Sequence, residues 1–258
     1  MVFWTLHRGF ACYALLLYSA IFIYFDFEAA EVFIYEPLIW FLIIFQISRH
    51  SGLGMTIGFH RFYSHAAFKT SRFVEFLIAY CCAASNQGGM SWWAGNHRYH
   101  HVHCDDDKDP HSPVTHSFLY SWLGWGYDPA HAPRSIKLRY PEIYWIDRWC
   151  FLVPWLEWGL FWLFSDSLAF ATLVSLLPAA LSPIGTLFFN SLSHGGKPDE
   201  QGCCARKYWQ LSAILLGEHD HRDHHIHPTK AKRPGLDLPY RLVIWPMEKL
   251  GAIWDVKY

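Results

Sequence analysis

The rest of the chain is best understood from one stretch, Trp92-Trp93-Ala94-Gly95-Asn96-His97-Arg98-Tyr99-His100-His101. Its three histidines are spaced as i, i+3 and i+4, which are positions on one face of an α-helix. Neutral imidazole is a ligand for zinc, copper, iron and nickel. The stretch therefore predicts a helix that presents part of a metal shell.

The same HxxHH pattern returns nearer the end of the chain, at His221, His224 and His225. A further pair, His60 and His65, lies in the segment HRFYSH. One HxxHH among 17 histidines could arise by chance. Two of them and a spaced pair, all beside apolar segments, are hard to assign to chance, so we expect these histidines to meet at a metal site.

Composition indicates an integral membrane protein. The 258 residues are 52% hydrophobic and 19% aromatic and include 14 tryptophans, which is high for a soluble globular chain. The net charge of -1 gives no electrostatic case for nucleic-acid binding. The 7 cysteines show no CxxC spacing, and their odd number and two adjacent pairs argue against a disulfide framework. We expect reduced thiols and no cysteine-ligated metal.

The basic residues are distributed as in a multi-pass membrane protein. No lysine or arginine occurs between Gly9 and Ser48 or between Trp149 and Gly196. By the positive-inside rule this pattern predicts four crossings, with both termini and the middle segment in the cytosol. The predicted spans cover residues 10–25, 32–54, 149–164 and 168–190, in a single membrane domain of residues 1–258 whose cytosolic segments are 55–148 and 191–258.

In the first two spans, the apolar stretches 10–25 and 32–47 are a little shorter than the ~20 residues that cross ~30 Å of hydrocarbon, a deficit that aromatic residues at the ends, tilt or bilayer thinning would cover. The acidic segment 26–31 is expected to form an outer turn, and 165–167 a tight turn between the last two spans. Pro154, Pro178 and Pro183 are expected to kink these last two helices. Glu157 would lie at membrane depth, where either a structural hydrogen bond or substrate binding explains it.

Several polar residues outside the three histidine patterns also suggest a site. Asn190 and His194 stand one helical turn apart, at the end of the fourth predicted span. The acidic segment 105–111 either orients ligand imidazoles through its carboxylates or is a solvated loop. The remaining histidines of these regions are expected to face solvent or to support the ligands: His103, His111, His116, His219 and His227.

The complete pattern resembles the integral-membrane fatty acyl desaturase family of the stearoyl-CoA desaturase type. GMTIGFHRFYSHAAFKTSR and SNQGGMSWWAGNHRYHHVHCDDDKDPHSP resemble the first two histidine boxes of that family with their flanks. RYPEIYWIDR, NSLSH, the third box GEHDHRDHHIHP and the ending LGAIWDVK follow in the family's order. The resemblance covers nearly the whole chain.

The resemblance implies an all-α integral membrane fold, with four transmembrane helices under a cytosolic helical cap. It also implies a di-iron centre, to which Asn190 contributes through a water and which these histidines hold: His60, His65, His97, His100, His101, His194, His221, His224 and His225. A narrow tunnel would lead the acyl chain past the irons. Trp92 and Trp93 either line this tunnel or pack at the membrane surface.

The expected reaction is O2-dependent, Δ9-type desaturation of a long-chain acyl group on CoA, with acyl carrier protein or an intact lipid as alternative carriers. An unactivated CH2–CH2 bond needs an oxidant that only a cofactor supplies, here two Fe ions with O2 as co-substrate. The chain has no nucleotide fingerprint, haem attachment motif or iron–sulfur cysteine set. Electrons are therefore expected from an external donor such as cytochrome b5 or ferredoxin, at a cytosolic face of the bacterial inner membrane or endoplasmic reticulum.

Two departures from the family pattern bear on the substrate. Asp220 stands where an aromatic residue is usual, and Trp122 replaces a common histidine. Cations at five positions either meet a phosphate-bearing headgroup or serve topology and anionic lipid: Lys69, Arg72, Arg134, Lys137 and Arg139. The alternative functions are an acyl hydroxylase or acetylenase on the same scaffold, and a non-catalytic, histidine-rich metal-binding or transport protein.

Overall fold

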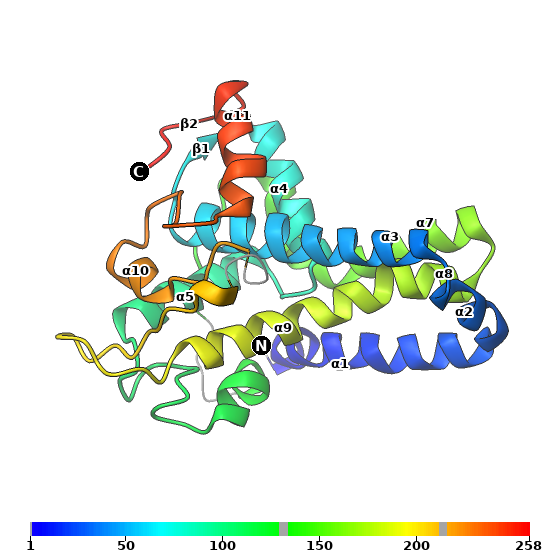
Figure 1. Ribbon diagram of the computed structural model, residues 1–258, viewed down its shortest axis with the longest axis horizontal. Coiled ribbons are helices and arrows are strands. Elements are labelled where there is room, and N and C mark those ends of the chain that lie inside the picture. The colour runs from blue at the N-terminus through cyan, green and yellow to red at the C-terminus, as the bar shows by residue number, and fades with distance from the viewer. Residues whose placement is uncertain (1, 129–133, 212–215) are drawn as a thin grey trace.

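The computed structural model describes residues 2–128, 134–211 and 216–258, and these residues are mostly helical (Figure 1). The sheet in this part of the chain has two short antiparallel strands, β1 (Lys69–Thr70) and β2 (Ile253–Trp254), which join the end of the first histidine box to the C-terminus. The helices are α1 (Val2–Phe25), α2 (Phe27–Ile34), α3 (Pro37–Ser48), η1 (Arg49–Ser64), α4 (Arg72–Ala84), α5 (Met90–Val102), η2 (Tyr120–Gly124), η3 (Trp125–Tyr127), α6 (Pro141–Arg148), η4 (Cys150–Leu152), α7 (Val153–Ser165), α8 (Leu168–Ala171), η5 (Thr172–Leu176), α9 (Leu177–Ser193), η6 (Trp209–Leu211), α10 (His221–Ile226), η7 (Tyr240–Ile244) and α11 (Trp245–Lys249).

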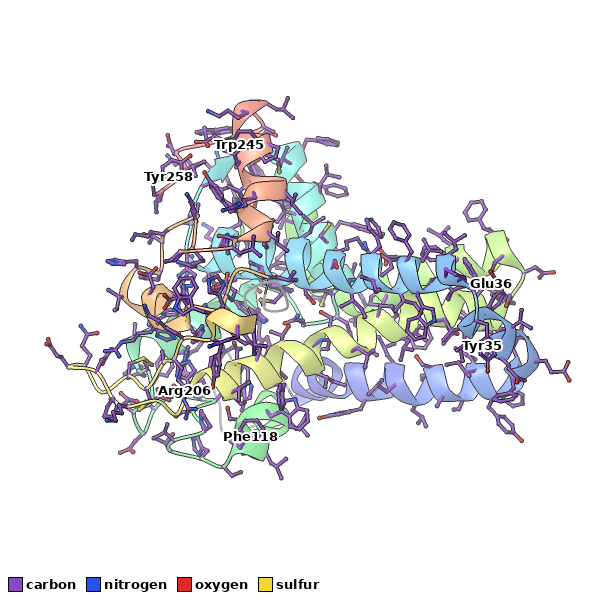
Figure 2. All side chains as sticks on the ribbon, viewed as in Figure 1. Tyr35, Glu36, Phe118, Arg206, Trp245 and Tyr258 are labelled. Carbon is purple, nitrogen blue, oxygen red and sulfur yellow. A yellow bond between two sulfur atoms is a disulfide. The ribbon has the colours of Figure 1, made fainter. Side chains whose placement is uncertain are left out.

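The long helices form an elongated body with the histidine-bearing elements at one end. Figure 1 shows α1, α3, α7 and α9 running along the long axis, whereas α5 and α10 gather at the opposite end from α2. The labelled Tyr35 and Glu36 mark the far end of this body in Figure 2. The outer surface of the long helices carries exposed apolar side chains such as Leu38, Phe41 and Leu163, as expected of a surface that contacts lipid.

Two helices in the described residues are long and apolar enough to cross a membrane, Pro37–Ser64 and Leu168–Ser193. They match the second and fourth predicted spans. The first and third predicted spans correspond to the shorter apolar helices Tyr13–Phe25 and Cys150–Ser165. The test by length and composition thus supports two of the four predicted crossings.

The boundaries differ from the predicted ones in an informative way. The helix of the second predicted span begins at Pro37, whose fixed φ suits a first helical turn. It continues without interruption to Ser64. The predicted acidic turn at 26–31 is instead largely the helix α2, which starts after Asp26. The first histidine box consequently lies on the same continuous helix as the second predicted span rather than in a separate segment.

The turn predicted at 165–167 is present. Asp166 adopts a left-handed conformation with φ 52°, and the Ser167 hydroxyl caps α8 by accepting from the amide of Phe170. Asp26 accepts hydrogen bonds from the Ser167 hydroxyl at 3.0 Å and from the Ala169 amide at 2.9 Å. The two hairpins are therefore joined at their far ends.

The three prolines occupy different positions in their helices. Pro154 lies near the start of the helix Cys150–Ser165, where a missing amide hydrogen costs little. Pro178 and Pro183 lie inside the continuous helix Leu168–Ser193. The kinks expected at these prolines stay a prediction.

Glu157 on α7 forms a buried ion pair. Its carboxylate accepts from both terminal nitrogens of Arg49, at 2.8 and 2.5 Å, and from the Tyr80 hydroxyl. These three residues come from η1, α4 and α7, so the network connects three helices inside an apolar body. The contacts support the structural explanation of Glu157 and leave no oxygen of its carboxylate without a partner.

We predict that Glu157→Ala destabilises the protein by about 3–5 kcal/mol, because it leaves the largely buried Arg49 guanidinium without its counter-ion. The exposed residue Glu36 offers a matched control, and Glu36→Ala is expected to change stability by no more than about 0.5 kcal/mol. Denaturant unfolding in detergent measures both. Equal stabilities of the two variants would show that the ion pair contributes nothing.

Candidate metal centre

The structure brings together the nine histidines that the sequence analysis selected. They come from η1 and the residue after it, from α5, from the residue after α9, and from α10, which are far apart in the sequence. Both HxxHH patterns are helical, as predicted. The nine rings form two adjacent clusters, a five-histidine cluster and a four-histidine cluster.

The five-histidine cluster consists of rings whose nitrogen atoms all lie within 4.8 Å of one another: His60, His65, His97, His101 and His224. The Nε2 atoms of His60 and His224 are 2.8 Å apart, and those of His65 and His97 are 3.0 Å apart. The Nε2 atom of His101 lies 3.1 Å from that of His97 and 2.8 Å from that of His224. These nitrogens point to a common centre.

The four-histidine cluster consists of His100, His194, His221 and His225. The Nε2 atom of His221 lies 3.0 Å from that of His194 and 3.3 Å from that of His225. Nitrogens of His100, His194 and His225 also lie within 4.8 Å of one another. The two clusters touch, since the rings of His101 and His225 are stacked with centroids 4.3 Å apart.

Each HxxHH pattern is divided between the clusters. On α5, His97 and His101 belong to the five-histidine cluster, whereas His100 belongs to the other. On α10 the i, i+4 pair lies in the four-histidine cluster and the central His224 in the five-histidine one. The three imidazoles of one pattern therefore do not fall in one cluster, and each of the two helices contributes rings to both clusters.

The spacing of the first pair follows from the winding of η1. This helix has π-type hydrogen bonds, and the amide of His65 donates to the carbonyl of His60, five residues earlier, at 3.1 Å. The wider turn brings residues five apart close together, and the two ring centroids are 4.9 Å apart. An HxxxxH pair would be spread much further around an α-helix.

Carboxylates from the acidic segment hold two of the rings. Asp109 accepts from Nδ1 of His100 at 2.8 Å, and Asp105 accepts from Nδ1 of His194 at 2.9 Å. For these two residues the orienting role is correct, whereas Asp106 and Asp107 are exposed, as in a solvated loop. With Nδ1 donating to Asp105, the neutral ring of His194 presents its Nε2 lone pair to the cluster.

The protonation of the rings suits metal binding. Burial, followed by the charges of neighbouring histidines, lowers the pKa of His97, His101 and His225 well below the usual value. Burial also lowers the pKa of His100, but the nearby Asp109 outweighs this effect and the net pKa is raised. The other three rings are consequently neutral at neutral pH, which is the ligand form of histidine.

A buried charge network beneath the five-histidine cluster was missed by sequence reasoning. Glu218 lies 3.4 Å from Nδ1 of His60 and pairs with Arg61, which also pairs with Asp237. Arg233 donates to Nδ1 of His224 at 2.6 Å. The sequence did contain a signal for this network. Charged residues directly beside the histidine boxes, such as Arg61 after His60, need oppositely charged partners if they are buried.

The other histidines fall into the two predicted groups. His111 is buried with its ring tilted against that of His100, centroids 4.2 Å apart, and His219 is fully buried with Nε2 bound to the Pro234 carbonyl at 2.8 Å. Both fit a supporting role and neither faces solvent. His116 and His227 are exposed and His103 is half-buried beside Asp106, as predicted for residues outside the cluster.

The predicted substrate-binding tryptophans lie at different distances from the cluster. Trp93 is buried and stacks on His97, with ring centroids 4.8 Å apart. Trp92 instead stacks on Trp125 at 5.6 Å. Asn190 is half-buried on α9, one turn before His194, which keeps it within the same part of the fold.

The cysteine prediction is wrong in one respect. Cys104 and Cys203 form a disulfide, while Cys81, Cys82, Cys150 and Cys204 are free. The pairing joins residues 99 apart in the sequence, so no spacing motif indicated it. Cys104 Sγ lies within 4.8 Å of nitrogens of His100, His194 and His225, but as half of a disulfide it has no thiolate to bind a metal.

Two of the five cations suggested for headgroup binding are already paired. Lys69 binds Asp255 at 2.7 Å, and Arg72 binds Glu142 through two contacts of 2.6 and 2.7 Å. The Arg134 guanidinium lies over the Tyr99 ring, 3.4 Å from its centroid. These contacts favour structural roles for the three residues.

The residues fit a metal centre on chemical grounds. The Nε2 atoms of His194 and His221 are 3.0 Å apart, and Nδ1 of His194 donates to Asp105, so the Nε2 lone pair of neutral His194 faces the neighbouring ring, where a cation would stabilise it. All-imidazole sets suit first-row transition metals, iron included, and exclude magnesium or calcium, which prefer oxygen.

Comparison with known proteins identifies the family. The family model described as fatty acid desaturase matches residues 35–240. The chain belongs to the fatty acid desaturase family. This confirms the resemblance inferred from the histidine boxes, and the protein is a fatty acyl desaturase enzyme.

This desaturase is similar to proteins from plants, cyanobacteria and yeast. It is 33% identical over 219 residues to Delta-9 acyl-lipid desaturase 2 of Arabidopsis thaliana, covering 80% of this chain and 71% of that protein. It is 30% identical over 228 residues to sn-1 stearoyl-lipid 9-desaturase of Anabaena variabilis, covering 84% and 82%. It is 31% identical over 196 residues to a probable acyl-CoA desaturase of Schizosaccharomyces pombe, covering 70% and 40%. The relatives imply a fatty acyl or lipid substrate and membrane association for this desaturase.

We predict that Asp109→Asn weakens metal binding by about 10- to 100-fold, because the His100 ring loses the carboxylate that orients it. Chelator competition with the iron-loaded desaturase measures this affinity. The control is Asp107→Asn, which changes an exposed carboxylate of the same loop and should leave the affinity unchanged. If the two variants bound iron with equal affinity, Asp109 would have no role in metal binding.

Proposed function

We propose that the chain catalyses O2-dependent desaturation of a long-chain fatty acyl group at a di-iron centre held by the two histidine clusters. The observation that carries this proposal is the convergence of nine imidazoles as two adjacent sets of four and five. Asn190 would complete the four-histidine set through a water, since it precedes His194 by one turn.

The chemistry requires the cofactor. Two bound iron ions would supply the activation of O2 that removal of hydrogen from an unactivated CH2–CH2 bond needs and that no side chain provides. The protein's own contribution is to bury the ligands, to fix their rings through Asp105, Asp109, Glu218 and Arg233, and to keep water away from the reacting carbons.

An apolar cavity next to the clusters suits the acyl chain. It has a volume of about 340 Å³ and lies between η1 and α9, lined on these helices by Met55, Thr56, Gly185, Thr186 and Phe189. The Phe189 ring touches the ring of His221, with centroids 5.6 Å apart. The cavity therefore adjoins the four-histidine cluster, and Trp93 would lie beside the five-histidine cluster, where it stacks on His97.

For the substrate carrier we favour an intact lipid, with acyl-CoA as the second candidate. The Arabidopsis and Anabaena relatives are acyl-lipid desaturases, whereas the yeast relative is a probable acyl-CoA desaturase. The pairing of Lys69 and Arg72 with carboxylates reduces the positive charge available for the phosphates of CoA. The relatives' names also support introduction of the double bond at position 9.

The proposal includes the membrane arrangement of the enzyme and its electron donor. The four apolar helices would cross the membrane, with the histidine clusters on the cytosolic side, where a separate donor such as cytochrome b5 or ferredoxin would deliver electrons. A hydroxylase or acetylenase would use the same clusters, and mass spectrometry distinguishes them, since desaturation removes two hydrogens and hydroxylation adds one oxygen. Membership in the desaturase family counts against a metal transporter.

We predict that His101→Ala abolishes the unsaturated product while the protein remains inserted in the membrane, because the five-histidine cluster loses a ligand. The exposed His116 provides the control, and His116→Ala should retain activity. Gas chromatography of fatty acids from an expression host that lacks its own desaturase measures both. Substantial product from His101→Ala would contradict the ligand assignment.

We also predict that Gly185→Leu lowers kcat/KM for stearoyl substrates more than for myristoyl substrates. A Cβ at Gly185 meets nothing within 4 Å, so the added side chain fits its helix and fills the cavity. Gly159→Leu on α7 is the matched control, because its Cβ also meets nothing within 4 Å and it lies outside this cavity. If both changes had the same effect on the two substrates, the cavity would not be the binding site of the acyl chain.

A further inference from the structure

The disulfide between Cys104 and Cys203 lies beside the four-histidine cluster. Cys104 is in the loop that follows α5, and Cys203 is in the loop that follows α9. Each loop begins just after histidines of the cluster, namely His100 on α5 and His194 after α9. Cys104 Sγ is 3.8 Å from Nδ1 of His194. The covalent bond thus closes the two loops directly against a candidate ligand.

The disulfide lies next to the carboxylate of Asp105, which binds the His194 ring. Asp105, next to Cys104, accepts from Nδ1 of His194 at 2.9 Å and from the amide of Cys204 at 2.8 Å. Cys204 is the neighbour of Cys203, so the two half-cystines flank this contact from both loops. The Cys204 carbonyl in turn accepts from the amides of Gly195 and Gly196, at 3.1 and 2.7 Å, which fixes the loop against the end of α9.

The same turn holds a second ring of the cluster. The amide of Asp105 donates to Asp109 at 2.9 Å, and Asp109 accepts from Nδ1 of His100 at 2.8 Å. The five-histidine cluster has other supports, because Glu218 and Arg233 contact its rings from a different segment. Loss of the disulfide should therefore loosen one cluster and spare the other.

The geometry points to a redox modification site: we infer that reversible reduction of Cys104–Cys203 controls how firmly the four-histidine cluster holds its metal. This inference rests on the proposed di-iron function. Disulfides of proteins that face a reducing compartment are usually catalytic or redox-sensing rather than permanent, so a disulfide at a metal cluster fits a sensor. Cys104 is partly exposed and its neighbours Val102 and Asp106 are exposed, which gives a reductant access.

The reaction is a thiol–disulfide exchange with a dithiol reductant. One thiolate of the reductant attacks a sulfur of the pair, the S–S bond breaks, and a mixed disulfide forms with one cysteine thiol released. The second thiol of the reductant resolves this mixed disulfide. Two electrons and two protons reach Cys104 and Cys203, which become thiols, and the reductant becomes a disulfide. Oxidation by the reverse exchange closes the loops again.

The test compares iron release from the full-length, iron-loaded protein in detergent before and after reduction with tris(2-carboxyethyl)phosphine, which has no thiol to bind iron. Peptide mass spectrometry after alkylation establishes the state of each cysteine. We expect a Cys104–Cys203 bond in the oxidised protein. Reduction should make half of the iron pass to a chelator at least about tenfold faster, the size expected when an orienting partner of a ligand is lost, while the other half is retained. Reoxidation should restore slow release.

Two variants give matched controls. Cys203→Ser should release half of its iron as fast as the reduced protein and should not respond to the phosphine. Cys81→Ser, which removes a free cysteine on α4, should behave like the unchanged protein. If Cys203→Ser fails to fold, the comparison of reduced and reoxidised wild-type protein still tests the inference.

The remaining outcomes separate the inference from the proposed function. Iron that is held equally in both redox states would overturn the redox site and leave the di-iron proposal intact. Free thiols at both positions after oxidation would do the same. A protein that takes up no iron in either state would overturn the proposed function and the redox site with it.

Discussion

Nine converging imidazoles, seven of them buried and two half-buried, are the constraint on which the structure depends. Each neutral ring has one N–H, so the close nitrogen pairs cannot all be linear hydrogen bonds, and a cation at the centre of each set would stabilise the lone pairs that face it. Protonation of several adjacent buried rings would be costly, and the lowered pKa values of His97, His101 and His225 agree with neutral rings. Metal binding and folding of this end of the molecule are thus expected to be coupled.

The long helices serve to bring these rings together. The helix from Leu168 to Ser193 has 26 residues and would be roughly 39 Å long at 1.5 Å per residue, more than the ~30 Å of a hydrocarbon core. Its end can therefore deliver His194 beyond the apolar layer. The helix from Pro37 to Ser64 reaches the same end, and its π-type winding turns His60 and His65 together. The Arg49–Glu157 pair joins the helix Pro37–Ser64 to α7, and Asp26, after α1, binds the start of the helix Leu168–Ser193.

Sequence reasoning predicted the nine converging histidines and the family but not how the histidines are divided. The HxxHH and HxxxxH patterns identified nine residues that do converge, because metal ligation demands particular residue types at particular spacings. The division of each pattern between two clusters was not predictable, since it depends on how α5 and α10 face each other. The burial of His111 and the Cys104–Cys203 pairing likewise depend on tertiary contacts over long sequence separations. The full length of the helix that ends at Ser64 was not predicted, because its second half is polar and resembles the start of a loop after an apolar span.

The central claim is that the two clusters hold two iron ions with nitrogen ligands. Metal analysis of the purified protein, combined with iron-edge X-ray absorption, tests this claim most directly. The account predicts two irons for each chain in a shell dominated by imidazole nitrogen, with two distinct rates of release to a chelator. A single zinc ion with no iron, or iron bound mainly through oxygen and sulfur, would contradict it.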